Sequence, residues 1–133
     1  MANKHRAAFE VEINGKGYAL RPTFEAVVEF NEVSGLDVFE ALDFFSKNKK
    51  LTVKIIVSSI YAGLYGENLV HGRSTPSYKS VGDMCQSYGF ANCMLAAIKF
   101  LQRGAASDET AKKLEEAEAE MMAQVKEENT EDP

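Results

Sequence analysis

The sequence predicts a mainly helical α+β fold, in which an N-terminal two-stranded β-hairpin packs on a bundle of about five short helices. Three observations lead to this fold class. Apolar and charged residues alternate before an Asn-Gly turn signal near the N-terminus. Further along, apolar residues recur at helical spacing in segments that glycine and serine separate. Residues 107–133 are acidic with a narrow apolar stripe, which indicates a C-terminal helix and tail outside a globular domain of residues 1–106.

The predicted hairpin occupies residues 7–21. Residues 7–13 alternate apolar and charged side chains, as a half-buried strand does. Residues 14–17, Asn-Gly-Lys-Gly, form a strong turn signal, and residues 18–21 form the return strand. Because an isolated hairpin is marginal in water, we expect it to pack on the helices or on another subunit.

The stretch that ends at Gly35 predicts a strand that runs directly into a short amphipathic helix. Thr23 can accept a backbone N–H at the helix start, and Glu25 places a negative charge in the first turn, where the helix dipole favours it. Gly35 suits a left-handed cap that ends the helix. The helical period then predicts an apolar face of Phe24, Val27 and Val28, and an acidic stripe of Glu25, Glu29 and Glu32.

A second helix follows at once. Asp37 and Glu40 stand in a capping-box arrangement at its start, and residues 47–50 end it. Phe39 and Phe44 lie about 100° or more to either side of its main apolar face, so both cannot easily be buried together. That main face consists of Val38, Ala41, Leu42 and Phe45.

The third predicted helix, from about Thr52 to Tyr65, is apolar over most of its circumference. Such a helix should form the buried centre of the domain. Residues 66–76 form the longest loop inside the domain. Ser77 can cap a fourth helix, which ends at Gly89.

The last two predicted helices differ in how much they can bury. A clean apolar stripe runs along the fifth helix, over residues 90–101. After a hinge at residues 104–107, residues 108–126 are predicted to form a solvated helix with a narrow stripe. The acidic end, residues 127–133, is expected to be disordered.

The negative charge of the chain is concentrated in its tail. The formal net charge is −5, and residues 107–133 carry ten acidic and three basic side chains, which leaves a net +2 on the rest. Without a basic face or stripe, we expect no nucleic-acid partner. No apolar run approaches the ~20 residues that cross a bilayer, and no secretory signal is expected at the N-terminus. We therefore expect no membrane partner and a cytoplasmic location.

No pattern in the sequence assembles catalytic, cofactor or metal chemistry. His5 and His71 are isolated, whereas a zinc site needs several ligands at ligand spacing. Cys85 and Cys93 form no Cys-x-x-Cys pair, so we interpret them as buried small hydrophobic residues. The expectation is a protein that is not an enzyme and that uses no cofactor and no metal.

Three features are candidate partner contacts. The stripe of Glu25, Glu29 and Glu32 is either a solvated face or a contact surface for a basic partner. Phe39 and Phe44 are either core residues or, where one of them is exposed, a contact for another protein. The apolar stripe of the C-terminal helix is too short and narrow for independent stability, so it either frays or orders on a partner or sister subunit. Its contact residues are Leu114, Met121 and Val125.

The chain also resembles a known family in three segments. The first is Tyr18–Gly35, with Leu-Arg-Pro-Thr-Phe-Glu-Ala at residues 20–26; the second is Ile60–Leu64 and the third Val81–Gly89. In this order they are similar to tail assembly chaperones of long-tailed phages and gene transfer agents, over roughly residues 7–101. In that family, a short hairpin is followed by a segment much like this one, in which the second strand leads into the first helix.

The resemblance implies a non-enzymatic role in building a phage tail. Members of the family bind the tape-measure protein and tail tube subunits before the tube polymerises, and they are absent from the finished particle. A location in the cytoplasm of the bacterial host follows. We also expect a homo-oligomer, because the hairpin has free edges and many apolar positions lie off the main helix faces.

Two other classes of protein remain open at this point. One is a structural component of the virion, such as a connector or minor tail protein. The other is an enzyme or small-molecule binder that uses the loop of residues 66–76.

Overall fold

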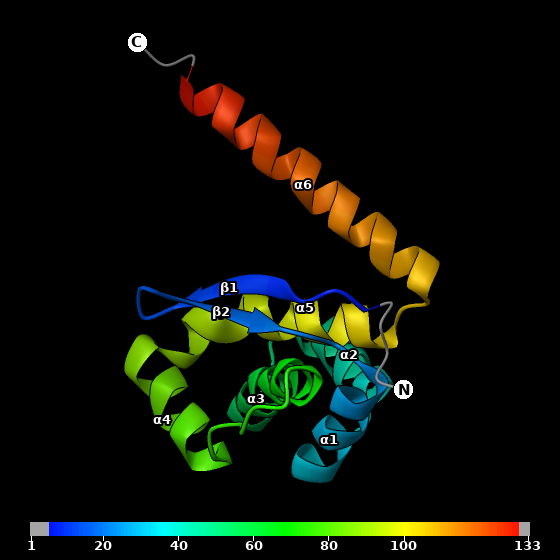
Figure 1. Ribbon diagram of the computed structural model, residues 1–133, viewed down its shortest axis with the longest axis vertical. Helices are drawn as coiled ribbons and strands as arrows, with labels where there is room; N and C mark the ends of the chain where they lie inside the picture. Colours follow the sequence, from blue (N-terminus) through cyan, green and yellow to red (C-terminus); the bar gives the residue numbers. More distant parts are fainter. Residues whose placement is uncertain (1–5, 131–133) are drawn as a thin grey trace.

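The computed structural model describes residues 6–130, without the side chains of Met122 and of residues 125–130. An antiparallel hairpin lies against a cluster of helices, and the last helix leads away from this body (Figure 1). The mainly helical α+β class with an N-terminal hairpin is thus confirmed. The elements in chain order are β1 (Phe9–Ile13), β2 (Lys16–Leu20), α1 (Phe24–Ser34), α2 (Val38–Asn48), α3 (Val53–Val70), α4 (Tyr78–Tyr88), the short 3₁₀-helix η1 (Phe90–Cys93), α5 (Met94–Ala105) and α6 (Asp108–Thr130).

The hairpin turn is tighter than predicted. Asn14 and Gly15 have positive φ angles of 59° and 80°, as a two-residue type I′ turn requires. Lys16 therefore pairs with Ile13, and β2 begins two residues earlier than the sequence predicts. Ile13 and Leu20 are buried in the core, so the hairpin packs on the helices as expected.

Helix α1 begins and ends as predicted but buries a different side. Thr23 Oγ1 accepts the N–H of Ala26 at 3.1 Å, and Gly35 ends the helix with a φ of 78°. The buried residues of α1 are Ala26, Phe30 and Ser34. They lie on a third side of the helix, away from both the predicted apolar face and the acidic stripe.

Helix α2 carries the predicted capping box. Asp37 Oδ1 accepts the N–H of Glu40 at 2.8 Å, and Glu40 Oε1 accepts the N–H of Asp37 at 3.1 Å. Val38 and Ala41 are buried, as the main apolar face predicts. The helix ends where Lys49 adopts a left-handed conformation, with a φ of 60°.

Helix α3 is the centre of the domain, as predicted, and contacts β2, α1, α4 and α5. It continues to Val70, five residues past the predicted end, so residues 66–70 of the predicted loop are helical. Gly66 explains this difference. A Cβ at Gly66 would lie 2.3 Å from the carbonyl oxygen of Arg21 and 2.9 Å from the Cβ of Ala26. The glycine therefore allows α3 to approach closely the segment in which β2 leads into α1, and it does not end the helix.

The predicted fifth helix is divided into η1 and α5. Gly104, assigned to a hinge in the sequence, is helical and packs against two other helices. A Cβ there would lie 3.1 Å from Val27 on α1 and 3.7 Å from Val38 on α2. The chain leaves the helix only after α5 ends, and Ser107 Oγ then accepts the N–H of Thr110 at 3.2 Å. This bond caps the start of α6.

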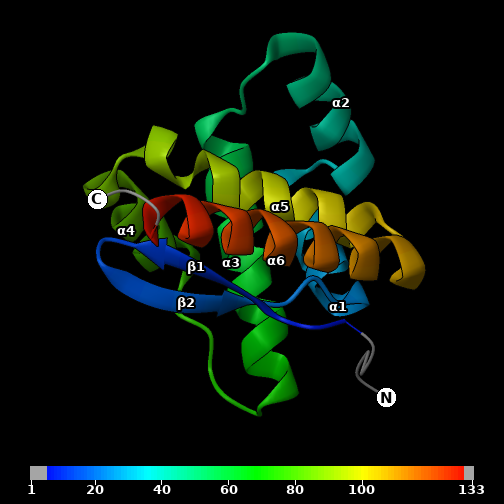
Figure 2. The same cartoon turned by 90° about the horizontal axis from the view of Figure 1, so that it is seen from above.

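Helix α6 leads away from the body next to one end of α5 (Figure 1). Seen from above, it points back along α5 (Figure 2). The helix runs to Thr130, past the predicted end at Lys126. Residues 131–133, the rest of the segment predicted to be disordered, lie outside the described part of the chain. Among the described helices, none is both long and apolar enough to cross a bilayer.

Ion pairs connect the first half of α6 to the body. Glu118 pairs with Lys99 at 3.1 Å and also with Arg103, whose side chain is buried on α5. Asp108 pairs with Arg6 at 3.0 Å. Ala111 of α6 is also buried and Leu114 is half-buried, so apolar contacts and ion pairs together hold the first half of the helix against the body.

Candidate partner-binding surfaces

The acidic stripe predicted on α1 is split between the surface and a helix interface. Glu32 is exposed, in agreement with a solvated face. Glu25 and Glu29 are half-buried, and Glu25 Oε1 is a buried oxygen without a hydrogen-bond partner among the described residues. Burial and the nearby Glu29 carboxylate raise the pKa of Tyr61 on α3. The solvated-face interpretation therefore holds for Glu32 alone, while Glu29 belongs to the contact between α1 and α3.

The two aromatic candidates on α2 have different surroundings. Phe39 is 66% exposed. Phe44 is half-buried and packs against the hydrophobic core. The exposed aromatic side chain on this helix is therefore Phe39, while Phe44 contributes to packing.

Two further exposed apolar side chains lie on α1, and the sequence did not single them out as contacts. Phe24 is 70% exposed and Val28 is 43% exposed. Both belong to the face that was expected to be apolar, but the core takes the side of α1 that carries Phe30. The sequence signal was present in the helical period, yet only tertiary packing decides which side of the helix is buried.

The exposed side chains of α1 and α2 come from helices that meet at Gly104. Val27 and Val38 both lie next to this glycine. Phe24 lines a shallow depression of about 240 Å³ together with Val27 and Gly104. We call the exposed apolar side chains of these two neighbouring helices, Phe24, Val28 and Phe39, the α1–α2 face, a name that refers to their exposure and not to contact among the three.

The contact stripe predicted on the C-terminal helix is only partly in contact with the body. Leu114 is half-buried, whereas Met121 is 65% exposed. Val125 lies in α6, but its side chain is outside the described part of the structure. Helix α6 therefore presents apolar surface at Met121 at a distance from the core.

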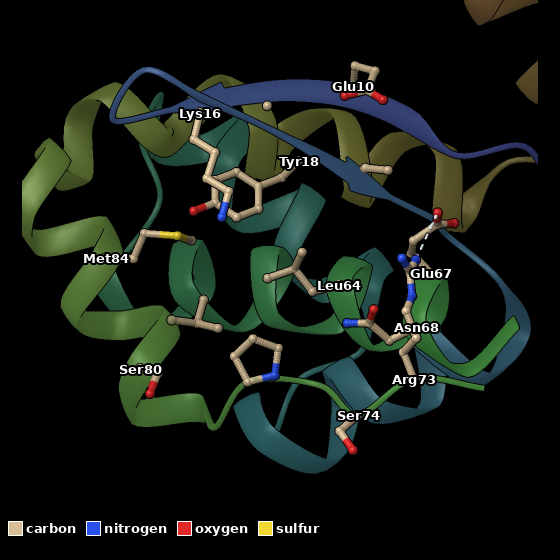
Figure 3. Close-up of a pocket in the computed structure, with 14 residues that line it drawn as sticks. Glu10, Lys16, Tyr18, Leu64, Glu67, Asn68, Arg73, Ser74, Ser80 and Met84 are labelled. Atoms are coloured by element: carbon tan, nitrogen blue, oxygen red, sulfur yellow. Dashed lines mark ion pairs between the residues drawn. The ribbon is translucent and has the colours of Figure 1, made fainter. Parts of the chain in front are cut away.

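A cleft that the sequence did not indicate lies between the hairpin and helices α3 and α4 (Figure 3). Its volume is about 680 Å³. Lys16 and Tyr18 reach from β2 into this space, and Leu64 of α3 and Met84 of α4 face them. The loop after α3, which one alternative assigns to a small-molecule site, borders the cleft at Arg73.

The loop end of the cleft carries more positive than negative charge. Glu67 pairs with Arg21 at 2.9 Å, and its carboxylate also lies 3.2 Å from His71 and 3.6 Å from Arg73. Two guanidinium groups and an imidazole thus share one carboxylate. Toward the opposite end, Lys16 lies over an aromatic ring of β2 and has no ion-pair partner in the part of the chain that the structure describes. Glu10 also lines the cleft and brings a second carboxylate next to Gly17. Lys16, Arg73 and Arg21 still place three positive charges at the cleft against the two negative charges of Glu10 and Glu67, so it can accept a further negatively charged group.

The two cysteines are free thiols buried in the core. Burial raises the pKa of Cys85 to about 12, and burial also raises the pKa of Cys93. Both thiols therefore stay protonated near neutral pH and are poor nucleophiles. Their predicted role as buried small residues is confirmed. Among the described residues, no group of three or more His, Cys, Asp or Glu side chains could hold a metal ion.

Comparison of the chain with known protein families, with curated proteins and with solved structures finds no match. The fold and its surfaces are therefore the basis for assigning a function. These define a helical α+β domain with an apolar α1–α2 face and a cleft bordered by a strand edge. The α1–α2 face exposes apolar side chains, and the cleft combines apolar with charged side chains; both compositions suit contact with another protein.

Proposed function

We propose that this protein is a tail assembly chaperone of a long-tailed phage, a prophage or a gene transfer agent. It binds the tape-measure protein and tail tube subunits during tail morphogenesis in the cytoplasm of the bacterial host. It is absent from the mature particle. This role uses protein contacts alone and requires no catalytic residue, cofactor or metal.

The observation that carries the proposal is the exposed α1–α2 face. Phe24 and Phe39 are 70% and 66% exposed. Full burial of such a side chain is worth about 1.5–3 kcal/mol, which a partner would recover on binding. A tape-measure protein is long and helical, with apolar surface that aggregates when bare. An amphipathic helix laid on the α1–α2 face would cover apolar surface on both proteins.

The junction between β2 and α1 is compatible with the family resemblance. Thr23 caps the helix, Glu25 lies in its first turn and Gly35 ends it. This is the segment in which the sequence resembles the chaperone family. The projecting acidic helix α6 adds negative charge that would keep a complex with an apolar partner in solution.

Self-association is part of the proposal. Apolar side chains are also exposed away from the α1–α2 face, at Val53, Leu95 and Met121. Burial of these side chains between copies of the chain would stabilise a homo-oligomer. Light scattering over a wide range of protein concentration should show a mass above that of the monomer, and a constant monomer mass would remove this part of the proposal.

The proposal is tested by following the protein through tail assembly. Co-expression should yield a complex with the tape-measure protein, and mass spectrometry of purified particles should not detect the chain. The alternative, a structural minor tail or connector protein, requires the chain in the particle at a fixed stoichiometry. Detection of the chain there would therefore favour the alternative.

A further inference from the structure

The strand β2 has an unpaired edge. Because Ile13 and Lys16 flank a two-residue turn, they form a hydrogen-bonded pair, and hydrogen-bonded pairs then recur at every second residue. Gly17 and Ala19 occupy the positions between them. Their N–H and C=O groups therefore point away from β1.

This edge is closed by α3 at one end only. The N–H of Arg21, the next outward-pointing group, donates to the carbonyl of Gly63 at 3.0 Å. The peptide groups of Gly17 and Ala19 have no hydrogen-bond partner among the described residues. Both residues line the cleft between β2, α3 and α4. Unpaired donors and acceptors of a strand thus open into a space of about 680 Å³.

The side chains around the edge select the chemistry of an occupant. Leu64 and Met84 provide an apolar floor under β2 (Figure 3). Lys16 and Arg73 border the cleft toward opposite ends. The carboxylate that pairs with Arg73, that of Glu67, is already paired with a second arginine, and the other carboxylate of the lining, that of Glu10, lies beside Gly17. An occupant with one apolar and one acidic side chain would complement both properties.

We propose that the cleft binds an extended acidic peptide segment of a partner protein, which adds to β2 as a third strand. Main-chain bonds to Gly17 and Ala19 hold the segment, an apolar side chain packs on Leu64, and a carboxylate meets Lys16 or Arg73. The free edge from Gly17 to Ala19 spans only about 7 Å, so side-chain contacts supply much of the affinity. This inference does not depend on the tape-measure role.

The probe is a peptide selected from a random heptapeptide library displayed on phage and panned against the full chain. Selected peptides should carry Asp or Glu beside β-branched or aromatic residues. A synthetic copy with blocked ends should shift the amide signals of Gly17 and Ala19 in ¹⁵N NMR spectra and slow their hydrogen exchange. Failure to select any peptide above the background of a blocking protein, or binding that leaves both amides unchanged, overturns the proposal.

Two further measurements separate strand addition from general charge attraction. The double variant Lys16→Glu/Arg73→Glu should weaken binding at least about tenfold, whereas Lys47→Glu, on α2, should change it less than about twofold. Two versions of the peptide, one N-methylated at the odd-numbered and one at the even-numbered residues, should differ in affinity. Only one of these two sets of N–H groups can point toward β2. Equal losses of affinity in the double variant and in Lys47→Glu would contradict binding in the cleft. Equal binding by both methylated peptides would contradict addition of a third strand.

Discussion

Helix α1 contains two phenylalanines with opposite surroundings. Phe30 is fully buried, and its ring packs against that of Phe100 with the centroids 6.1 Å apart. Phe24, on the same helix, is 70% exposed. The packed interior around α3 and the open α1–α2 face thus use the same residue type in different ways. Packing within the domain explains the burial of Phe30, and we assign the exposed Phe24 to contact with a partner.

The largest expected effect comes from truncation inside the packed region. Phe30→Ala should lower the free energy of unfolding by about 3–5 kcal/mol, because it leaves a cavity beside Phe100. Phe24→Ala should change it by less than about 0.5 kcal/mol, because the side chain is largely in water already. Urea denaturation measures both values. Similar losses for the two variants would show that Phe24 belongs to the core.

The next test concerns the close approach of α3 to the segment in which β2 leads into α1. Gly66→Ala should destabilise the fold by about 1–3 kcal/mol, because the new Cβ would overlap the carbonyl oxygen of Arg21. Gly82→Ala on α4 is the matched control. Its Cβ would lie 3.8 Å from Val57, an ordinary contact, so the higher helix propensity of alanine should stabilise the protein by about 0.5–1 kcal/mol. Thermal unfolding compares the two, and a neutral Gly66→Ala variant would refute the close packing.

The buried thiols predict a pH dependence of stability. The pKa of Cys85 is about 12 in the folded state and 9.0 ordinarily, so above pH 9 the unfolded chain loses this proton while the folded chain keeps it. The contribution of the buried neutral thiol to the free energy of unfolding is therefore complete below pH 9 and is lost as the pH rises toward 12. Relative to Cys85→Ala, the wild type should lose stability between pH 9 and 11. Parallel curves for the two proteins would show that the thiol is not shielded from water.

The smallest effect is expected at the projecting helix. Glu118→Gln removes the charge that pairs with Lys99 and Arg103, so α6 should exchange its amide hydrogens faster. The free energy of unfolding of the domain should fall by less than about 1 kcal/mol. Glu116→Gln, an exposed neighbour, is the control and should leave the exchange rates unchanged. Unchanged exchange in Glu118→Gln would mean that other contacts orient α6.

The sequence predicted the features that short-range chemistry determines. The caps at Thr23, Asp37 and Ser77, the glycine stop at Gly35 and the Asn-Gly turn all depend on neighbouring residues, and all are present. The predicted end of α3 was wrong because Gly66 allows a close contact with Arg21 and Ala26, which are far away in the sequence, and does not end the helix. The predicted buried side of α1 was wrong for a related reason, because more than one side of that helix could have packed against the core.

The candidate surfaces could be predicted only in part. Phe39 was identified because two aromatic side chains on α2 cannot share one buried side. Phe24 was missed because its exposure depends on which arc of α1 the core takes. The loop of residues 66–76 was considered as a binding site, but the cleft that it borders was missed. The walls of the cleft come from separate segments, and its unpaired strand edge follows from the register of the hairpin.

The proposed role depends on binding of the tape-measure protein to the α1–α2 face. The most direct measurement is the amount of soluble tape-measure protein that co-purifies with the chain after co-expression. We expect Phe24→Ala/Phe39→Ala to fold normally and to reduce this amount at least about tenfold, as loss of central aromatic contacts does. The control Leu69→Ala/Val70→Ala, which removes exposed apolar side chains at the end of α3, should retain it. A folded Phe24→Ala/Phe39→Ala protein that co-purifies the tape-measure protein at the wild-type yield would show that this face does not bind it.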